Sequence, residues 1–153
     1  GVTEDDKDFS MISARFIQEQ VDSILGALTV FLMIVSGISL LVGAIGISNT
    51  MFMSVLERTR EIGVLKSIGA TSKQIQDVFL MEASMIGISG GILGLVAGAL
   101  LVELVIFFGF DAVISVEMAA VAFIVSVGVG ITAGTVPAKN ASKVPAIEAL
   151  RYE

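Results

Sequence analysis

Three long stretches without a charged residue dominate the hydrophobic pattern of the chain. They run from Ser23 to Leu56, from Ala83 to Val102 and from Met118 to Ala138. A helix needs about 20 apolar residues to cross about 30 Å of hydrocarbon, and each stretch reaches that length. The pattern therefore predicts an all-α membrane protein with three transmembrane helices. The predicted spans cover approximately residues 25–50, 79–107 and 117–137.

The segment between the first two spans, residues 54–77, is basic and amphipathic rather than uniformly apolar. Its apolar residues recur at roughly helical spacing, with charges between them; they are Leu56, Ile62, Leu65 and Ile68. Gly69 suits the position just after a helix end. Thr71 followed by Gln74 is a capping-box pattern, which starts a helix at Ser72. We therefore expect an amphipathic helix, a turn, and a second helix that runs on into the next span.

Charge is distributed unevenly between the two sides of the predicted membrane segments. Seven of the nine basic residues fall in segment 54–77 or after the third span, and these are Arg58, Arg60, Lys66, Lys73, Lys139, Lys143 and Arg151. Loops rich in Lys and Arg stay in the cytoplasm. The distribution predicts a multi-pass protein of the plasma or inner membrane with a cytoplasmic loop, a cytoplasmic tail (residues 138–153) and an N-terminus outside.

Glycines in the second and third spans have spacings typical of close helix packing. The second span contains three overlapping G-x-x-x-G pairs, and in lipid such positions let two backbones approach. The predicted packing residues are Gly87, Gly90, Gly91, Gly94, Gly98, Gly130 and Gly134. The pattern leaves open whether these residues pack within one chain or across a dimer.

Two carboxylates, Glu82 and Glu103, flank the second span. They are separated by about 32 Å of helix, which nearly equals the hydrocarbon thickness, so both can sit at the membrane interfaces. The apolar run continues past Glu103, however, and an intramembrane carboxylate is a candidate ion site. A small oligomeric channel or ion-coupled transporter that uses Glu103 is therefore an alternative function.

The sequence lacks the residues on which most catalytic mechanisms depend. The chain has no Cys and no His, the residues that supply thiolate nucleophiles, imidazole bases and the usual zinc ligands. It contains no G-x-x-x-x-G-K-[ST] phosphate-binding loop, and the G-x-G-x-x-A match at residues 128–133 lies within a span rather than after a strand. We expect a non-catalytic protein with no metal or cofactor in this chain and no nucleic-acid partner.

Two motifs resemble the C-terminal membrane part of MacB/FtsX-type ABC transporter permeases. They are NTMFMSVLERTREIGVLKSIGATSKQI, residues 49–75, and PAKNASKVPAIEALRYE, residues 137–153. The resemblance extends over nearly all of the chain after Ile24 and implies a permease domain at 24–153. Residues 1–23 then look like an extracytoplasmic stalk helix, whose apolar face would include Phe9, Ile12 and Phe16. The family's first span and outer domain are missing, which implies a fragment or a split subunit.

The resemblance also implies a function, a homodimer in the bilayer, and a separate ABC ATPase that binds ATP and magnesium. In this family a cytoplasmic coupling helix seats on the ATPase, and hydrolysis drives motion across the membrane (mechanotransmission, efflux or extraction of a substrate). The matching positions are Glu57, Arg58, Arg60, Glu61, Leu65, Lys66, Gly69 and Ala70. Leu65 and Ile68 would form an apolar knob with a charged rim, and Arg60 and Glu61 can pair along the helix. A structural membrane subunit whose loop binds a scaffold is a further alternative.

Overall fold

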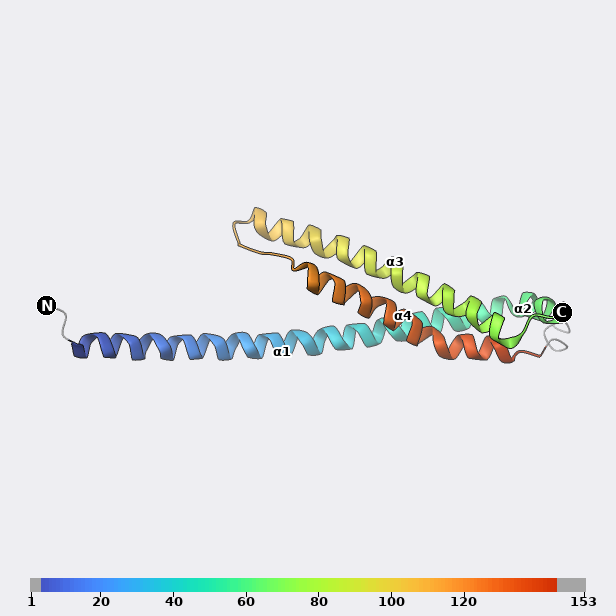
Figure 1. The fold of residues 1–153 in the computed structure, drawn as a ribbon, viewed down its shortest axis with the longest axis horizontal. Coiled ribbons are helices and arrows are strands. Elements are labelled where there is room, and N and C mark those ends of the chain that lie inside the picture. Colours follow the sequence, from blue (N-terminus) through green and yellow to red (C-terminus); the bar gives the residue numbers. More distant parts are fainter. Residues whose placement is uncertain (1–3, 146–153) are drawn as a thin grey trace. The chain divides into compact units, whose positions relative to one another are not determined.

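The computed structural model describes residues 4–145, with side chains from Arg15 onward. It contains four helices in chain order: α1 (Glu4–Glu57), α2 (Thr59–Ser67), α3 (Ser72–Phe107) and α4 (Val116–Lys143) (Figure 1). No strand occurs between residues 4 and 145. Helices α1, α3 and α4 are each long and apolar enough to cross a membrane. The predicted all-α membrane class is confirmed.

The structure divides into two parts, one up to Leu41 and one from Val42 onward. The first part is helical from Glu4, and its side chains from Arg15 to Leu41 are all exposed. Phe16, predicted to lie on an apolar stalk face, is 61% exposed. Phe9 and Ile12, its predicted companions, lie outside the residues whose side chains are described. The second part contains the last turns of α1 together with α2, α3 and α4.

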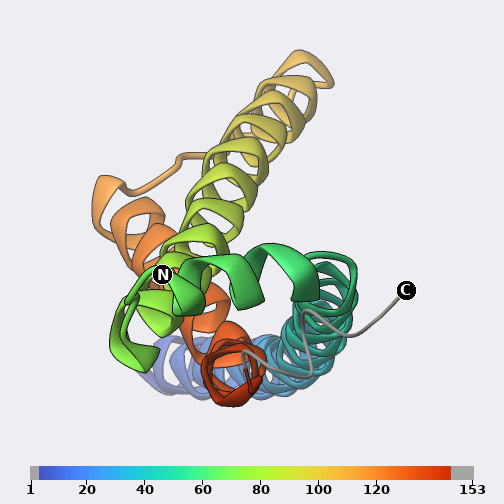
Figure 2. The ribbon, with the colours of Figure 1, turned by 90° about the vertical axis from the view of Figure 1, so that its right-hand side faces the viewer.

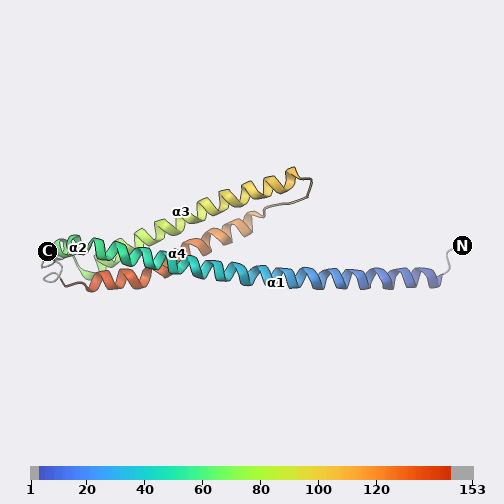
Figure 3. The same ribbon diagram turned by 180° about the vertical axis from the view of Figure 1, so that it is seen from behind.

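Helices α3 and α4 form an antiparallel pair joined by residues 108–115 (Figure 3). The turn begins at Gly109, whose φ of 89° favours glycine. The N–H groups of Gly109 and Phe110 donate to the carbonyls of Ile106 and Val105, which caps the end of α3 in a Schellman motif. The two helices are in close contact around Gly87 and Gly130 and diverge toward the connection (Figure 1).

The core of the second part lies where α2 crosses between the last turns of α1 and the start of α3, over the end of α4 (Figure 2). All four helices contribute buried apolar side chains, which are Met51, Val55, Ile62, Ile75, Phe79, Ala83, Ala138 and Ala141. The residues that α4 contributes to this cluster are alanines, which leave room for the larger side chains of α1, α2 and α3. This cluster holds α2 against the ends of the longer helices.

The two caps predicted between α2 and α3 are confirmed. The Thr71 hydroxyl accepts from the Gln74 N–H at 3.3 Å, while the Thr71 N–H donates to the Gln74 side-chain oxygen at 2.8 Å. Gly69 has a φ of 103°, and its N–H and that of Ala70 donate to carbonyls in the last turn of α2. Both helix ends are therefore defined by local hydrogen bonds.

Helix α4 continues beyond residue 137, the predicted end of the third span. Pro137 lies inside the helix and is almost fully buried, and α4 ends only at Lys143. Proline lacks the N–H that would bond one turn back, but its fixed φ remains compatible with helix. The predicted tail thus begins as helix, whereas its final part, residues 146–153 with Arg151, lies outside the described residues.

Candidate functional site

Helix α2 is anchored on one side and exposed on the other. Ile62 is 2% exposed and Gly63 is buried, and both face the core. The opposite side carries a mixture of apolar and charged residues, hereafter the α2 surface, which comprises Arg60, Glu61, Val64, Leu65 and Ile68. The buried side fixes the position of α2, so the α2 surface is held in a defined orientation.

The α2 surface contains unusually exposed apolar side chains for a segment between two spans. Leu65 is 44% exposed and Ile68 is 77% exposed. A groove of about 380 Å³ lies between α2 and the start of α3, and Leu65 and Ile68 both line it. A second hollow involves Leu65 with Arg60 and Glu61. Exposed apolar residues rimmed by charges are typical of a protein or membrane contact.

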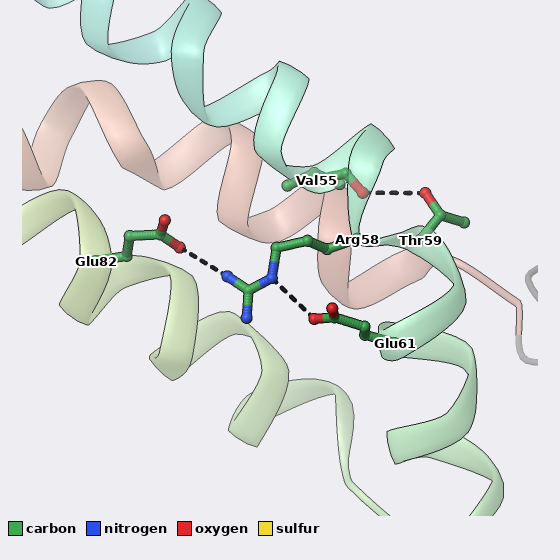
Figure 4. A network of polar contacts seen from close by, with 5 residues as sticks. All are labelled: Val55, Arg58, Thr59, Glu61 and Glu82. Carbon is green, nitrogen blue, oxygen red and sulfur yellow. Dashed lines mark hydrogen bonds and ion pairs between the residues drawn. The ribbon is translucent and has the colours of Figure 1, made fainter.

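Arg58 lines this groove and lies between two carboxylates (Figure 4). Its Nε lies 3.0 Å from Glu61 Oε2, and its Nη1 lies 3.3 Å from Glu82 Oε2 on α3. Its guanidinium carbon is 5.6 Å from the centre of the Phe79 ring, within range of a cation–π contact. Glu61 therefore pairs with Arg58 and not with Arg60, the partner that the sequence left possible. Arg58 is the partner of Glu61 because its side chain extends between α2 and α3, where it also contacts Glu82.

We expect Glu82→Gln to lower the free energy of unfolding by less than about 1 kcal/mol, as is usual for solvent-exposed ion pairs. The two side chains are 43% and 39% exposed, so water screens their attraction. Thermal unfolding in lipid nanodiscs would measure the change, with Glu57→Gln at the exposed end of α1 as the matched control. A loss above about 3 kcal/mol would instead indicate a desolvated pair and contradict this interpretation.

Lys66 connects α2 to the end of α4. Its Nζ donates to the carbonyl oxygens of Ser142 and Val144, each at 2.7 Å. Lys66 is only partly exposed, whereas the other predicted charged positions Glu57, Arg60 and Glu61 are exposed. The predicted coupling residues thus fall into two groups: Arg58 and Lys66 make contacts within the chain, and most of the others face outward. Gly69 shapes the turn after α2, and Ala70 packs against the core.

The predicted packing glycines divide between two faces. Gly87, Gly91, Gly130 and Gly134 lie where α3 meets α4, and a Cβ added at any of them would collide with the opposite helix. A Cβ on Gly87 would lie 2.9 Å from the Ser126 carbonyl oxygen, and one on Gly130 would lie 2.9 Å from Gly87 Cα. The remaining three have no atom within 4 Å of such a Cβ, namely Gly90, Gly94 and Gly98.

Sequence reasoning missed several contacts that hold the site together. The Ser126 hydroxyl donates to the Gly87 carbonyl at 2.9 Å, across the α3–α4 interface. Neither this bond nor the contacts of Lys66 with α4 leave a signal in residue spacing, because the partners are distant in sequence. The Arg58–Glu82 pair was detectable in principle, since both charges flank apolar segments on the same predicted side.

No group of three metal-binding side chains occurs among the residues whose side chains are described. Glu103, on which the channel hypothesis depends, is exposed on α3 and does not line the groove beside α2. Among the described residues, the grooves that combine exposed apolar side chains with charged ones lie at α2. We take the α2 surface as the candidate functional site.

Three apolar helices of membrane-crossing length define a multi-pass membrane protein. The short helix α2, packed across their ends, exposes the α2 surface beside the spans. A family comparison narrows this class. Residues 33–146 match the model described as FtsX-like permease C-terminal. The chain belongs to this family, and the resemblance seen in its loop and tail motifs is confirmed.

Relatives agree with the family assignment. The chain is 43% identical to an uncharacterized ABC transporter permease of Methanocaldococcus jannaschii, over 97% of this chain and 39% of the relative. It is 40% identical to the macrolide export ATP-binding/permease protein MacB of Bdellovibrio bacteriovorus, over 95% and 22% respectively. It is 38% identical to the uncharacterized ABC transporter permease YknZ of Bacillus subtilis, over 95% and 37%. The chain thus spans between about a fifth and two fifths of these relatives.

Proposed function

We propose that this chain is the part of an ABC transporter membrane subunit that receives motion from a separate ATPase through the α2 surface. The observation that carries the proposal is the combination of an anchored and an exposed side on one short helix. Ile62 is buried in the core, while Leu65 and Ile68 remain largely exposed. A partner that bound these residues would displace α2, and the buried side would pass the displacement to the long helices.

Under this proposal, the partner protein binds and hydrolyses ATP. The sequence has no phosphate-binding loop, and one relative is named as both ATP-binding protein and permease, at more than four times the length that this chain covers. The partner ATPase would bind ATP and magnesium. This chain would act without catalysis, as one half of a homodimer that converts hydrolysis into mechanotransmission, efflux or extraction.

The proposed orientation follows from charge. Lys and Arg residues gather in segment 54–77 and at the end of α4, which favours a cytoplasmic location for both. Residues 24–153 would then be the permease domain with its C-terminus inside, and residues 1–23 would be a stalk outside. This orientation places the α2 surface where an ATPase can reach it.

We expect a photo-crosslinker on Ser67→Cys to capture an ABC ATPase in native membranes. Ser67 is exposed beside the α2 surface, and the chain has no native Cys, so one label position is unambiguous. Mass spectrometry would identify the adduct by peptides of a phosphate-binding-loop ATPase. The same crosslinker on Leu101→Cys, exposed on α3 near its other end, is the control. Adducts with lipid alone at Ser67 would contradict the proposal and favour a membrane-anchoring role for α2.

A further inference from the structure

Lys66 makes a contact that joins two helices far apart in sequence. Its ammonium donates to Ser142 and Val144, which are 76 and 78 residues away. Helix α2 is linked to α1 and α3 by the chain itself, through Arg58 on one side and the turn at Gly69 on the other. It has no such link to α4. A side-chain contact must therefore supply any stiff connection between these two helices.

The end of α4 is chemically suited to hold an ammonium group. The last four carbonyls of a helix have no partner within it. The aligned backbone dipoles also place partial negative charge there, which favours a cation. Ser142 is in the last turn of α4, Val144 is its C-cap residue, and Lys66 donates to both at 2.7 Å. A lysine ammonium has three donors, so two fixed carbonyls define its position well.

The other connections of α2 are of a different kind. Its apolar contact through Ile62 is non-directional, so it does not by itself hold α2 at one position relative to the end of α4. The Arg58–Glu82 pair is exposed and reaches α3 rather than α4. The Lys66 bonds are short, partly buried and charge-assisted, which makes them the stronger and more directional class of contact.

We propose that Lys66 is a positioning residue that locks α2 to the C-terminal end of α4, so that the two helices move as one unit. This inference extends the proposed function. It depends on that function in one respect only, namely that a partner ATPase displaces α2. A partner that pushed on Leu65 would then move α4 as well as α3. Without the lock, displacement of α2 would reach α4 only through the non-directional apolar contacts of the core.

The first test measures the lock without any ATPase. Spin labels on Ser67→Cys and Asn140→Cys, both exposed, report the distance between α2 and α4 in the full chain in lipid nanodiscs. We expect a narrow distance distribution that broadens in Lys66→Met and narrows again in Lys66→Arg, which restores a cation. Lys143→Met removes a charge from the same helix end at an exposed position and is expected to leave the distribution narrow. An unchanged distribution in Lys66→Met would overturn the proposal.

Hydrogen exchange supplies a second readout on unlabelled protein. Loss of charge-assisted bonds lowers the free energy of local opening, so amides in the last turn of α4 are expected to exchange at least about tenfold faster in Lys66→Met. If Lys66→Met does not fold, Lys66→Gln, which keeps a donor, replaces it in both measurements with the same expected direction. Equal exchange in the variant and in Lys143→Met would count against the lock.

The second test separates the lock from the proposed function. In the complex with the captured ATPase, Lys66→Met is expected to keep ATPase association. It is expected to lose most of the ATP-dependent change in the signal of a spin label on Asn140→Cys. An undiminished change would overturn the proposal. If the native chain binds no ATPase, the proposed function fails, while the distance and exchange measurements still decide the role of Lys66.

Discussion

Leu65→Asp is expected to weaken association with the partner ATPase by about 100-fold or more. Burying an exposed leucine contributes about 1.5–3 kcal/mol, and burying an unpaired carboxylate adds a further cost. Each 1.4 kcal/mol is about tenfold in affinity. Leu65 lines both hollows at α2 and is 44% exposed, so a partner seated there must cover it. Binding of the purified ATPase to chain-containing nanodiscs measures the effect.

Two controls distinguish a lost contact from a damaged protein. Leu65→Met keeps an apolar side chain of similar volume and is expected to retain most of the affinity. Ser72→Asp adds the same charge on the exposed first turn of α3, where a helix N-terminus favours an acidic residue. Affinity that stayed unchanged in Leu65→Asp, with the spans still inserted, would rule out the α2 surface as the docking site.

Gly87→Val is expected to lower the free energy of unfolding by about 3 kcal/mol, at the upper end of overpacking effects, with loss of α3–α4 packing. A Cβ there would lie 2.9 Å from the Ser126 carbonyl oxygen and 3.1 Å from Val127 Cα. Both are backbone atoms, which cannot move aside as the end of a flexible side chain can. Thermal unfolding and crosslinking between cysteines introduced into α3 and α4 would measure the loss.

Gly94→Val is the matched control for this substitution. It lies on the same helix, also within the span, and nothing lies within 4 Å of an added Cβ. The same change in helix propensity therefore occurs without a collision inside the chain. Equal destabilisation of the two variants would show that the loss comes from glycine replacement in general and not from the α3–α4 contact.

The sequence pattern is sufficient to predict the long helices and the two caps between α2 and α3. Three uncharged stretches of membrane-crossing length correspond to α1, α3 and α4, and the Thr71–Gln74 pair correctly marked the start of α3. These features depend on composition or on residues three or four positions apart. Local physics is enough to determine them, so no knowledge of tertiary packing was needed.

Features that depend on distant partners could not be read from spacing. Overlapping G-x-x-x-G pairs on α3 identify two glycine faces, but only the position of α4 decides that Gly87 and Gly91 are covered while Gly90 is not. The family resemblance marks Lys66 as a coupling position, but its contacts with the end of α4 join residues that are far apart in sequence. The continuation of α4 past Pro137 to Lys143 also has no signal in the apolar pattern, because the uncharged stretch ends at Ala138.

The junction between α1 and α2 consists of a single residue. Helix α1 ends at Glu57, α2 begins at Thr59, and the N–H of Arg58 still donates to the Ser54 carbonyl at 3.0 Å. One inserted or deleted residue here would turn α2 by about 100° relative to the end of α1. Leu65 and the Lys66 ammonium would then point in different directions. We therefore expect this junction to tolerate a substitution better than a change in its length.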